Sequence, residues 1–200
     1  MVVFDPVKFM GFVAGSSLLG AVLLLGSPAK SQEVSVEYTK IDAASCMTLV
    51  LNEEEGYSEQ VCKGADGIAV FVSDGDLRQS VSYRNQDAGD RRFGFGNFNH
   101  VGDTIEWRIK EDERGWARPY ATILRWHVSL DDNNEQQALV ITKIEDRDFC
   151  VAGLVDASTQ SNANELARQI ADEVTPSFVC GQDEAQWHGE TGLLAAASLR

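Results

Sequence analysis

Apolar and polar side chains alternate along two long segments of the chain, residues 104–110 and 118–130. Because successive side chains of a strand point to opposite faces, this alternation predicts two strands, each with one buried and one solvent-facing side. Trp126 falls on the apolar side of the second strand, whereas Arg125 and His127 fall on the polar side. The same pattern predicts shorter strands at residues 34–38, 67–73, 77–83, 138–144 and 149–155.

Polar turn segments separate these strands. The sequence DGD at residues 74–76 favours a tight hairpin, since Asp-Gly accepts the positive φ that such turns require. Turns at residues 131–137 and 145–147 then join the last strands into a meander. Residues 43–51 are a short apolar run that fits either a strand or a helix, and the pattern alone does not decide between them.

One helix is predicted after the last strand. Asn162 is a suitable N-cap, and Glu165 three residues later completes a capping box. Apolar residues then recur at four-residue spacing until Pro176 ends the helix. The predicted fold class is therefore α+β, an antiparallel β-meander sheet with one C-terminal helix packed on it.

The first 31 residues are predicted to be a signal peptide. Lys8 precedes an uncharged apolar run at residues 9–25, and Ala29 and Ser31 are small residues suited to cleavage before Gln32. An uncleaved membrane anchor is the alternative, because the run approaches the ~18 residues that span a bilayer. The remaining chain is divided into a single α+β domain at residues 32–182 and a poorly ordered C-terminal tail at residues 183–200, with a short helix at residues 192–199.

All four cysteines follow the predicted signal peptide, which favours two disulfides in an exported, periplasmic or secreted protein. Four cysteines allow three pairings, and their spacing favours the two local pairs, Cys46–Cys62 and Cys150–Cys180. A zinc site is the rival interpretation, but the chain has no CxxC pair. The predicted domain is therefore stapled by disulfides.

The formal net charge of −14 at pH 7 changes the expected partners. An acidic surface repels nucleic acid and anionic lipid, and it attracts a basic protein at long range. We therefore expect a basic protein partner and no nucleic acid. Contact with a membrane is expected only through the N-terminal segment, if that segment stays uncleaved.

Sequence motifs of catalysis are few. His127, with Arg125 and a cross-strand carboxylate such as Glu106, is the candidate for a hydrolase site. The three histidines are predicted to lie in a loop, a strand and the tail, and no HExxH motif occurs, so no metal site is expected. No Walker loop or GxGxxG motif occurs either, so no cofactor is expected.

An aromatic segment is the second candidate site. Phe93, Phe95 and Phe98 alternate with glycines and asparagines, and Arg91 and Arg92 precede them. Such a segment presents aromatic faces to a ligand or a partner protein. In the alternative interpretation, the first two phenylalanines form a short edge strand and the glycines mark a bulge.

The segments VCKGADGIAVFVSDGDLRQSVSY, VGDTIEWRI, RPYATILRW and NELARQIADE occur in this order between Cys46 and Cys180. Their order resembles that of a group of small exported alphaproteobacterial proteins of unassigned function. The resemblance implies an envelope protein of a Gram-negative bacterium. It transfers no catalytic residue.

These observations lead to one main hypothesis and two alternatives. The main hypothesis is a non-enzymatic, periplasmic binding module for a protein or another ligand, in its most specific version an inhibitor of a basic envelope enzyme. The first alternative is a hydrolase with an unrecognised active site around His127. The second is a passive structural component of the envelope.

Overall fold

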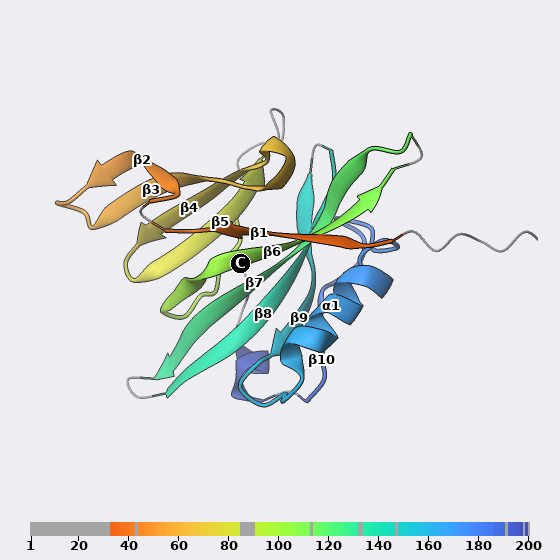
Figure 1. Ribbon diagram of the computed structural model, residues 1–200. Helices are drawn as coiled ribbons and strands as arrows, with labels where there is room; N and C mark the ends of the chain where they lie inside the picture. The colour runs from red at the N-terminus through yellow and green to blue at the C-terminus, as the bar shows by residue number, and fades with distance from the viewer. Residues whose placement is uncertain are drawn as a thin grey trace, which may run out of the picture. The chain divides into compact units, whose positions relative to one another are not determined.

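The computed structural model describes residues 33–42, 44–84, 91–112, 114–131, 134–146, 148–190, 192–197 and 199. The predicted signal peptide lies outside these residues. The chain divides into two units, and the described residues belong to the second, Gln32–Arg200. In this unit ten strands form one mostly antiparallel sheet, and one α-helix packs on it (Figure 1). The predicted fold class is confirmed.

The strands pair in the order β10-β9-β8-β7-β6-β5-β4-β3-β2, and β1 pairs with β6. Two pairings are parallel, that of β10 with β9 and a single residue pair between β5 and β6. The strands are β1 (Ser35–Lys40), β2 (Cys46–Asn52), β3 (Tyr57–Lys63), β4 (Ala69–Gly75), β5 (Arg78–Arg84), β6 (Asn99–Glu111), β7 (Ala117–Asp131), β8 (Asn134–Ile144), β9 (Phe149–Asp156) and β10 (Gln186–His188). The helices are α1 (Ala163–Glu173) and two 3₁₀ turns, η1 (Ala65–Gly67) and η2 (Leu193–Ala196).

Two strand details differ from the sequence prediction. The β4–β5 hairpin turns at Asp76 and Leu77, which both have positive φ, and Gly75 is still paired with Arg78. The turn therefore lies just after the predicted Asp-Gly position. Strand β3 is absent from the prediction because its sequence, YSEQVCK, has no clear apolar side. The ambiguous segment at residues 43–51 contains β2, paired with β3.

The larger core lies on one face of the sheet. It joins the two halves of the sheet, β2–β5 and β6–β10, which meet between β5 and β6. Most of its buried side chains come from β4 to β9, and they pack together although only Arg78 and Asn99 pair the backbones of β5 and β6. Trp126 and Trp107 are fully buried there, which confirms the predicted core position of Trp126. Tyr83 packs edge-on against Trp107 with ring centroids 5.7 Å apart. Side-chain packing, more than the backbone ladder, holds the halves together.

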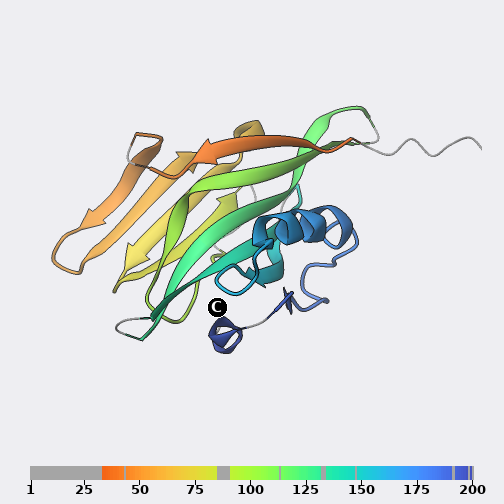
Figure 2. The same cartoon turned by 60° about the horizontal axis from the view of Figure 1, so that its bottom comes forward.

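Helix α1 covers the opposite face of the sheet, against β7, β8 and β9 (Figures 1 and 2). The predicted helix is confirmed, and it ends at Glu173 before Pro176. Its alanines permit close approach, as does Gly153 of β9, where an added Cβ would lie 3.0 Å from Ile170 Cγ2. Asn162 is the N-cap residue, but its side chain makes no capping hydrogen bond and accepts one from Gln160.

Both predicted disulfides are present. Cys46–Cys62 links directly opposed residues of β2 and β3. Cys150–Cys180 ties β9 to the segment after α1. Disulfides of this kind are typical of an oxidising, extracytoplasmic compartment. Among the described residues, no helix is long and apolar enough to cross a membrane.

The prediction of a poorly ordered tail is wrong for the described part of residues 183–200. Strand β10 pairs with the edge of β9, and Leu194 in η2 is fully buried in the larger core. Leu199 forms a bridge with Phe95. The structure of the tail could not be predicted from sequence periodicity, because a three-residue strand and one 3₁₀ turn are too short to show a period.

Truncating Leu194 tests this tail. Leu194→Ala should lower the free energy of unfolding by about 2–5 kcal/mol, because it leaves a cavity in the core. Leu193 is the matched control, since it is 65% exposed and its truncation should cost about 0.5 kcal/mol or less. Denaturant unfolding with the disulfides intact measures both. Equal stability of the two variants would contradict burial of the tail.

Candidate functional site

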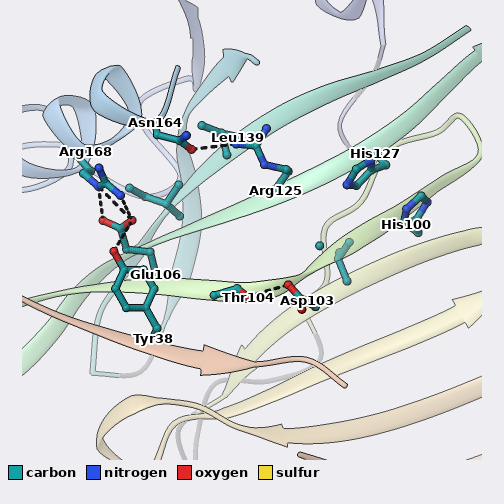
Figure 3. Close-up of a pocket in the computed structure, with 13 residues that line it drawn as sticks. Tyr38, His100, Asp103, Thr104, Glu106, Arg125, His127, Leu139, Asn164 and Arg168 are labelled. Carbon is teal, nitrogen blue, oxygen red and sulfur yellow. Dashed lines mark hydrogen bonds and ion pairs between the residues drawn. The ribbon is translucent and has the colours of Figure 1, made fainter. Parts of the chain in front are cut away.

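A groove of about 570 Å³ lies beside α1, on the face of the sheet that this helix covers (Figure 3). Helix α1 has 11 residues and is about 16 Å long, whereas the 15 residues of β7 extend over about 50 Å. The helix therefore covers Ala121 and Ile123 but leaves Arg125 and His127 uncovered on the same face of β7. The groove lining is Tyr38, His100, Val101, Gly102, Asp103, Thr104, Glu106, Ile123, Arg125, His127, Leu139, Asn164 and Arg168.

A polar stripe on α1 faces this groove and the strand behind it. Asn164, Arg168 and Asp172 recur every four residues and so lie on one side of the helix. Each contacts a charged residue of the sheet: Asn164 contacts Arg125, Arg168 contacts Glu106 and Asp172 contacts Arg108. The sequence contains this signal, since the stripe runs beside the alanines of α1, but four-residue spacing of polar residues on a helix does not by itself show which side chains of the sheet they meet.

Glu106 is buried and paired with two arginines at one end of the groove. Arg168 binds it with Nε 2.8 Å from Oε1 and Nη2 2.9 Å from Oε2, and Arg108 donates from Nη1 at 3.0 Å. The Tyr38 hydroxyl adds a 3.3 Å hydrogen bond. The hydrogen bond to Glu106 raises the pKa of Arg168. The sequence prediction that the polar side of β6 faces solvent is wrong here, because α1 and β1 cover Glu106 and Arg108.

Arg108 also forms a bidentate pair with Asp172, with Nη2 2.6 Å from Oδ2 and Nε 3.0 Å from Oδ1. Tyr120 donates its hydroxyl hydrogen to the same carboxylate. Burial by itself raises the pKa of Asp172, but these hydrogen bonds outweigh it and leave the pKa below its usual value. Burial likewise lowers the pKa of Arg108, and its bonds to Asp172 and Glu106 reverse that effect. The network fixes α1 against β6.

Arg125 differs from these arginines in its partners. Its Nη1 donates to Gln137 Oε1 at 2.8 Å and its Nη2 donates to Asn164 Oδ1 at 2.9 Å, and both acceptors are neutral amides. Burial lowers the pKa of Arg125. The guanidinium is therefore held in place and partly desolvated, with no carboxylate contact among the described residues.

His100 and His127 meet at the other end of the groove. They are directly opposed on β6 and β7, and their rings stack at 4.5 Å and 6°. His127 Nδ1 also lies 2.9 Å from Glu135 Oε1 across the β7–β8 pairing. The pair was not predicted, because alternation of apolar and polar residues begins only at residue 104 and places His100 in a loop, whereas β6 begins at Asn99.

The hydrolase candidates line one groove but do not form a catalytic unit. Figure 3 shows Glu106 pointing to Arg168 and away from His127, and Arg125 pointing to Asn164. The carboxylate that contacts His127 is Glu135. The groove lining includes His127, Arg125 and Glu106, but Glu106 pairs with Arg168 and not with His127.

The aromatic segment does not form one binding surface. Phe93 and Phe95 are 7% and 3% exposed, so the interpretation that they meet a ligand is wrong. Phe93 bridges to Val81 in the manner of the predicted edge strand. Phe98 is exposed beneath the guanidinium of Arg78. The two arginines have separate partners, since Arg91 pairs with Asp148 and Arg92 with Glu59.

Comparisons with known proteins give no match: no protein-family model, no curated protein sequence and no solved structure is significantly similar to this chain. The function is therefore inferred from the groove itself. Its two distinctive features are the guanidinium of Arg125 and the stacked histidines.

Replacing Asp172 tests the network that fixes α1. Because the folded-state pKa of Asp172 is depressed, its carboxylate stabilises the fold above its unfolded-state pKa of about 3.8 and loses this effect as the pH falls through the lower folded value. The free energy of unfolding should thus be lower for Asp172→Asn than for the wild type near neutral pH. This difference should shrink below about pH 4. Denaturant titrations across pH measure it, and a constant difference would contradict the role of the charge.

Proposed function

We propose that the protein is an exported, non-enzymatic binding module that holds a small organic acid in the groove beside α1. Arg125 carries this proposal. A guanidinium binds a carboxylate through two parallel N–H donors, and such charge-assisted bonds are about twice as strong as neutral ones. Here the guanidinium faces the groove with two neutral amide partners. A ligand carboxylate would supply the missing negative charge.

The form of the groove supports a preorganised site. Gln137 and Asn164 fix both Nη atoms of Arg125, so little side-chain freedom is lost when a ligand binds. The volume of about 570 Å³ lies in the range of small-molecule sites. Ile123 and Leu139 also line the groove, and apolar side chains favour an organic acid over an inorganic anion.

The net charge of −14 opposes this ligand only at long range. Salt screens exposed charges beyond about 8 Å at physiological ionic strength, so the groove's own charges dominate the affinity. The negative charge instead supports a basic protein partner, including the inhibitor version, on a surface other than this groove. No described contact selects such a surface, and this partner stays a prediction.

The other elements of the proposal have separate support. The two disulfides support export to an oxidising compartment, with residues 1–31 as the signal peptide. The hydrolase alternative has less support, because the carboxylate of Glu106 forms ion pairs with Arg108 and Arg168 and does not contact His127. A passive structural role gives no reason for the amide-held guanidinium of Arg125.

A panel of organic acids, each paired with its neutral primary amide, tests the proposal. In thermal unfolding of the purified, oxidised protein, at least one acid should raise the melting temperature while its amide does not. A ligand at 100 times its dissociation constant stabilises by about 2.7 kcal/mol, which such a scan resolves. Failure of every acid, or equal stabilisation by acids and amides, would contradict the proposal.

Arg125→Gln then locates the binding. The variant should weaken the acid about tenfold or more, since a hydrogen bond to a charged group contributes about 1.5–3 kcal/mol. Arg118→Gln is the matched control, because Arg118 lies on the same strand but pairs with Asp66 outside the groove. Equal affinity of the wild type and Arg125→Gln would contradict the assigned site.

A further inference from the structure

We propose that His100, His127 and Glu135 bind a divalent transition-metal ion of the zinc type at the end of the groove away from α1. This inference goes beyond the organic-acid proposal and does not depend on it, because it uses different side chains and a different ligand. It rests on three potential metal ligands that lie far apart in the sequence and are close together in the fold.

Strand register brings these three residues together. His100 on β6 is paired with His127 on β7, and β8 returns beside β7 with Gln137 opposite His127. Glu135 lies two residues from Gln137 on β8, so its side chain falls on the same face of the sheet. One ligand atom from each of the three residues lies within 4.8 Å of the other two.

The ligand types select the class of metal. Two imidazoles and one carboxylate form a set that binds Zn²⁺ in catalytic sites, where a fourth position stays open for water or another ligand. Calcium and magnesium prefer oxygen ligands and are disfavoured by the two nitrogens. The imidazole-rich set also accepts Cu²⁺ and Ni²⁺, in the usual order of affinity. Zn²⁺ is the probe that fits both the number and the type of ligands.

Small side-chain rotations complete the geometry. Donors around a zinc ion at about 2.0–2.1 Å lie closer together than 4.8 Å, so the three groups must converge. His100 and Glu135 are exposed, so space is open for their side chains to rotate toward His127, which is partly buried. The contact of His127 Nδ1 with Glu135 Oε1 at 2.9 Å already joins two of the ligands.

The surrounding charge permits a cation. The overall charge of the protein is negative and raises the local concentration of cations. Arg125 is a nearby positive group on the same face of β7, and its guanidinium points toward Asn164, away from the histidine pair (Figure 3). It weakens metal binding through space but does not occupy the position between the ligands.

Calorimetric titration of Zn²⁺ into the oxidised, chelator-treated protein, without a histidine tag, tests the site. We expect one ion per chain with a dissociation constant below about 10 μM, near the −7 kcal/mol that this affinity represents. Binding should weaken about tenfold or more in His100→Gln, His127→Gln and Glu135→Gln, since even loss of an outer-shell partner costs 10–100-fold. Circular dichroism checks that each variant is folded.

His188→Gln is the matched control, because His188 lies on β10 and outside the cluster. It should bind Zn²⁺ as the wild type does. Arg125→Gln removes a nearby positive charge, so it should bind Zn²⁺ at least as tightly as the wild type while it loses the organic acid, which separates the two sites. In imidazole NMR spectra, Zn²⁺ should shift the signals of two histidines and leave the third unchanged. No binding below about 100 μM, or an equal loss in the control and cluster histidine variants, would overturn the proposal.

Discussion

Burial of β7 on both faces is the constraint on which the rest of the structure depends. Leu124 and Trp126 point into the core shared by the two halves of the sheet, while Ala121 and Ile123 lie beneath α1. A strand enclosed in this way must occupy the middle of the sheet. The groove follows directly, because α1 is too short to cover the whole strand and its cover ends before Arg125.

Ion pairs determine where α1 lies on this face. Glu106 and Arg108 are charged, and they are stable beneath the helix only because Arg168 and Asp172 pair with them. Buried ion pairs contribute little net stability over apolar residues, but an unpaired buried charge is costly, so they discriminate against other helix positions. The same positioning brings the side chain of Asn164 within hydrogen-bond distance of Arg125. One side of α1 therefore supplies both the ion pairs that fix the helix and the asparagine that contacts Arg125 in the groove.

Alternation and spacing predicted the features that depend on local sequence: the strands with a clear apolar side, the helix, the core position of Trp126 and both disulfides. Which strands are neighbours is not a local property. His100 was assigned to a loop, and its pairing with His127 became visible only when β6 proved to begin five residues earlier than predicted. The burial of Glu106 and Arg108 could not be predicted for the same reason: it depends on partners in α1, which is distant in the sequence.

The two ends of the groove have opposite electrostatic needs. Arg125 is a desolvated cation with neutral partners, and the histidine–glutamate cluster offers three donors suited to a cation. Both lie on one face of β7, with Arg125 and His127 two residues apart. A bound metal ion would favour an acid nearby, and a bound acid would favour the metal. By thermodynamic linkage each would strengthen the other by the same factor, so the two proposed sites, although independently testable, would act as one binding surface.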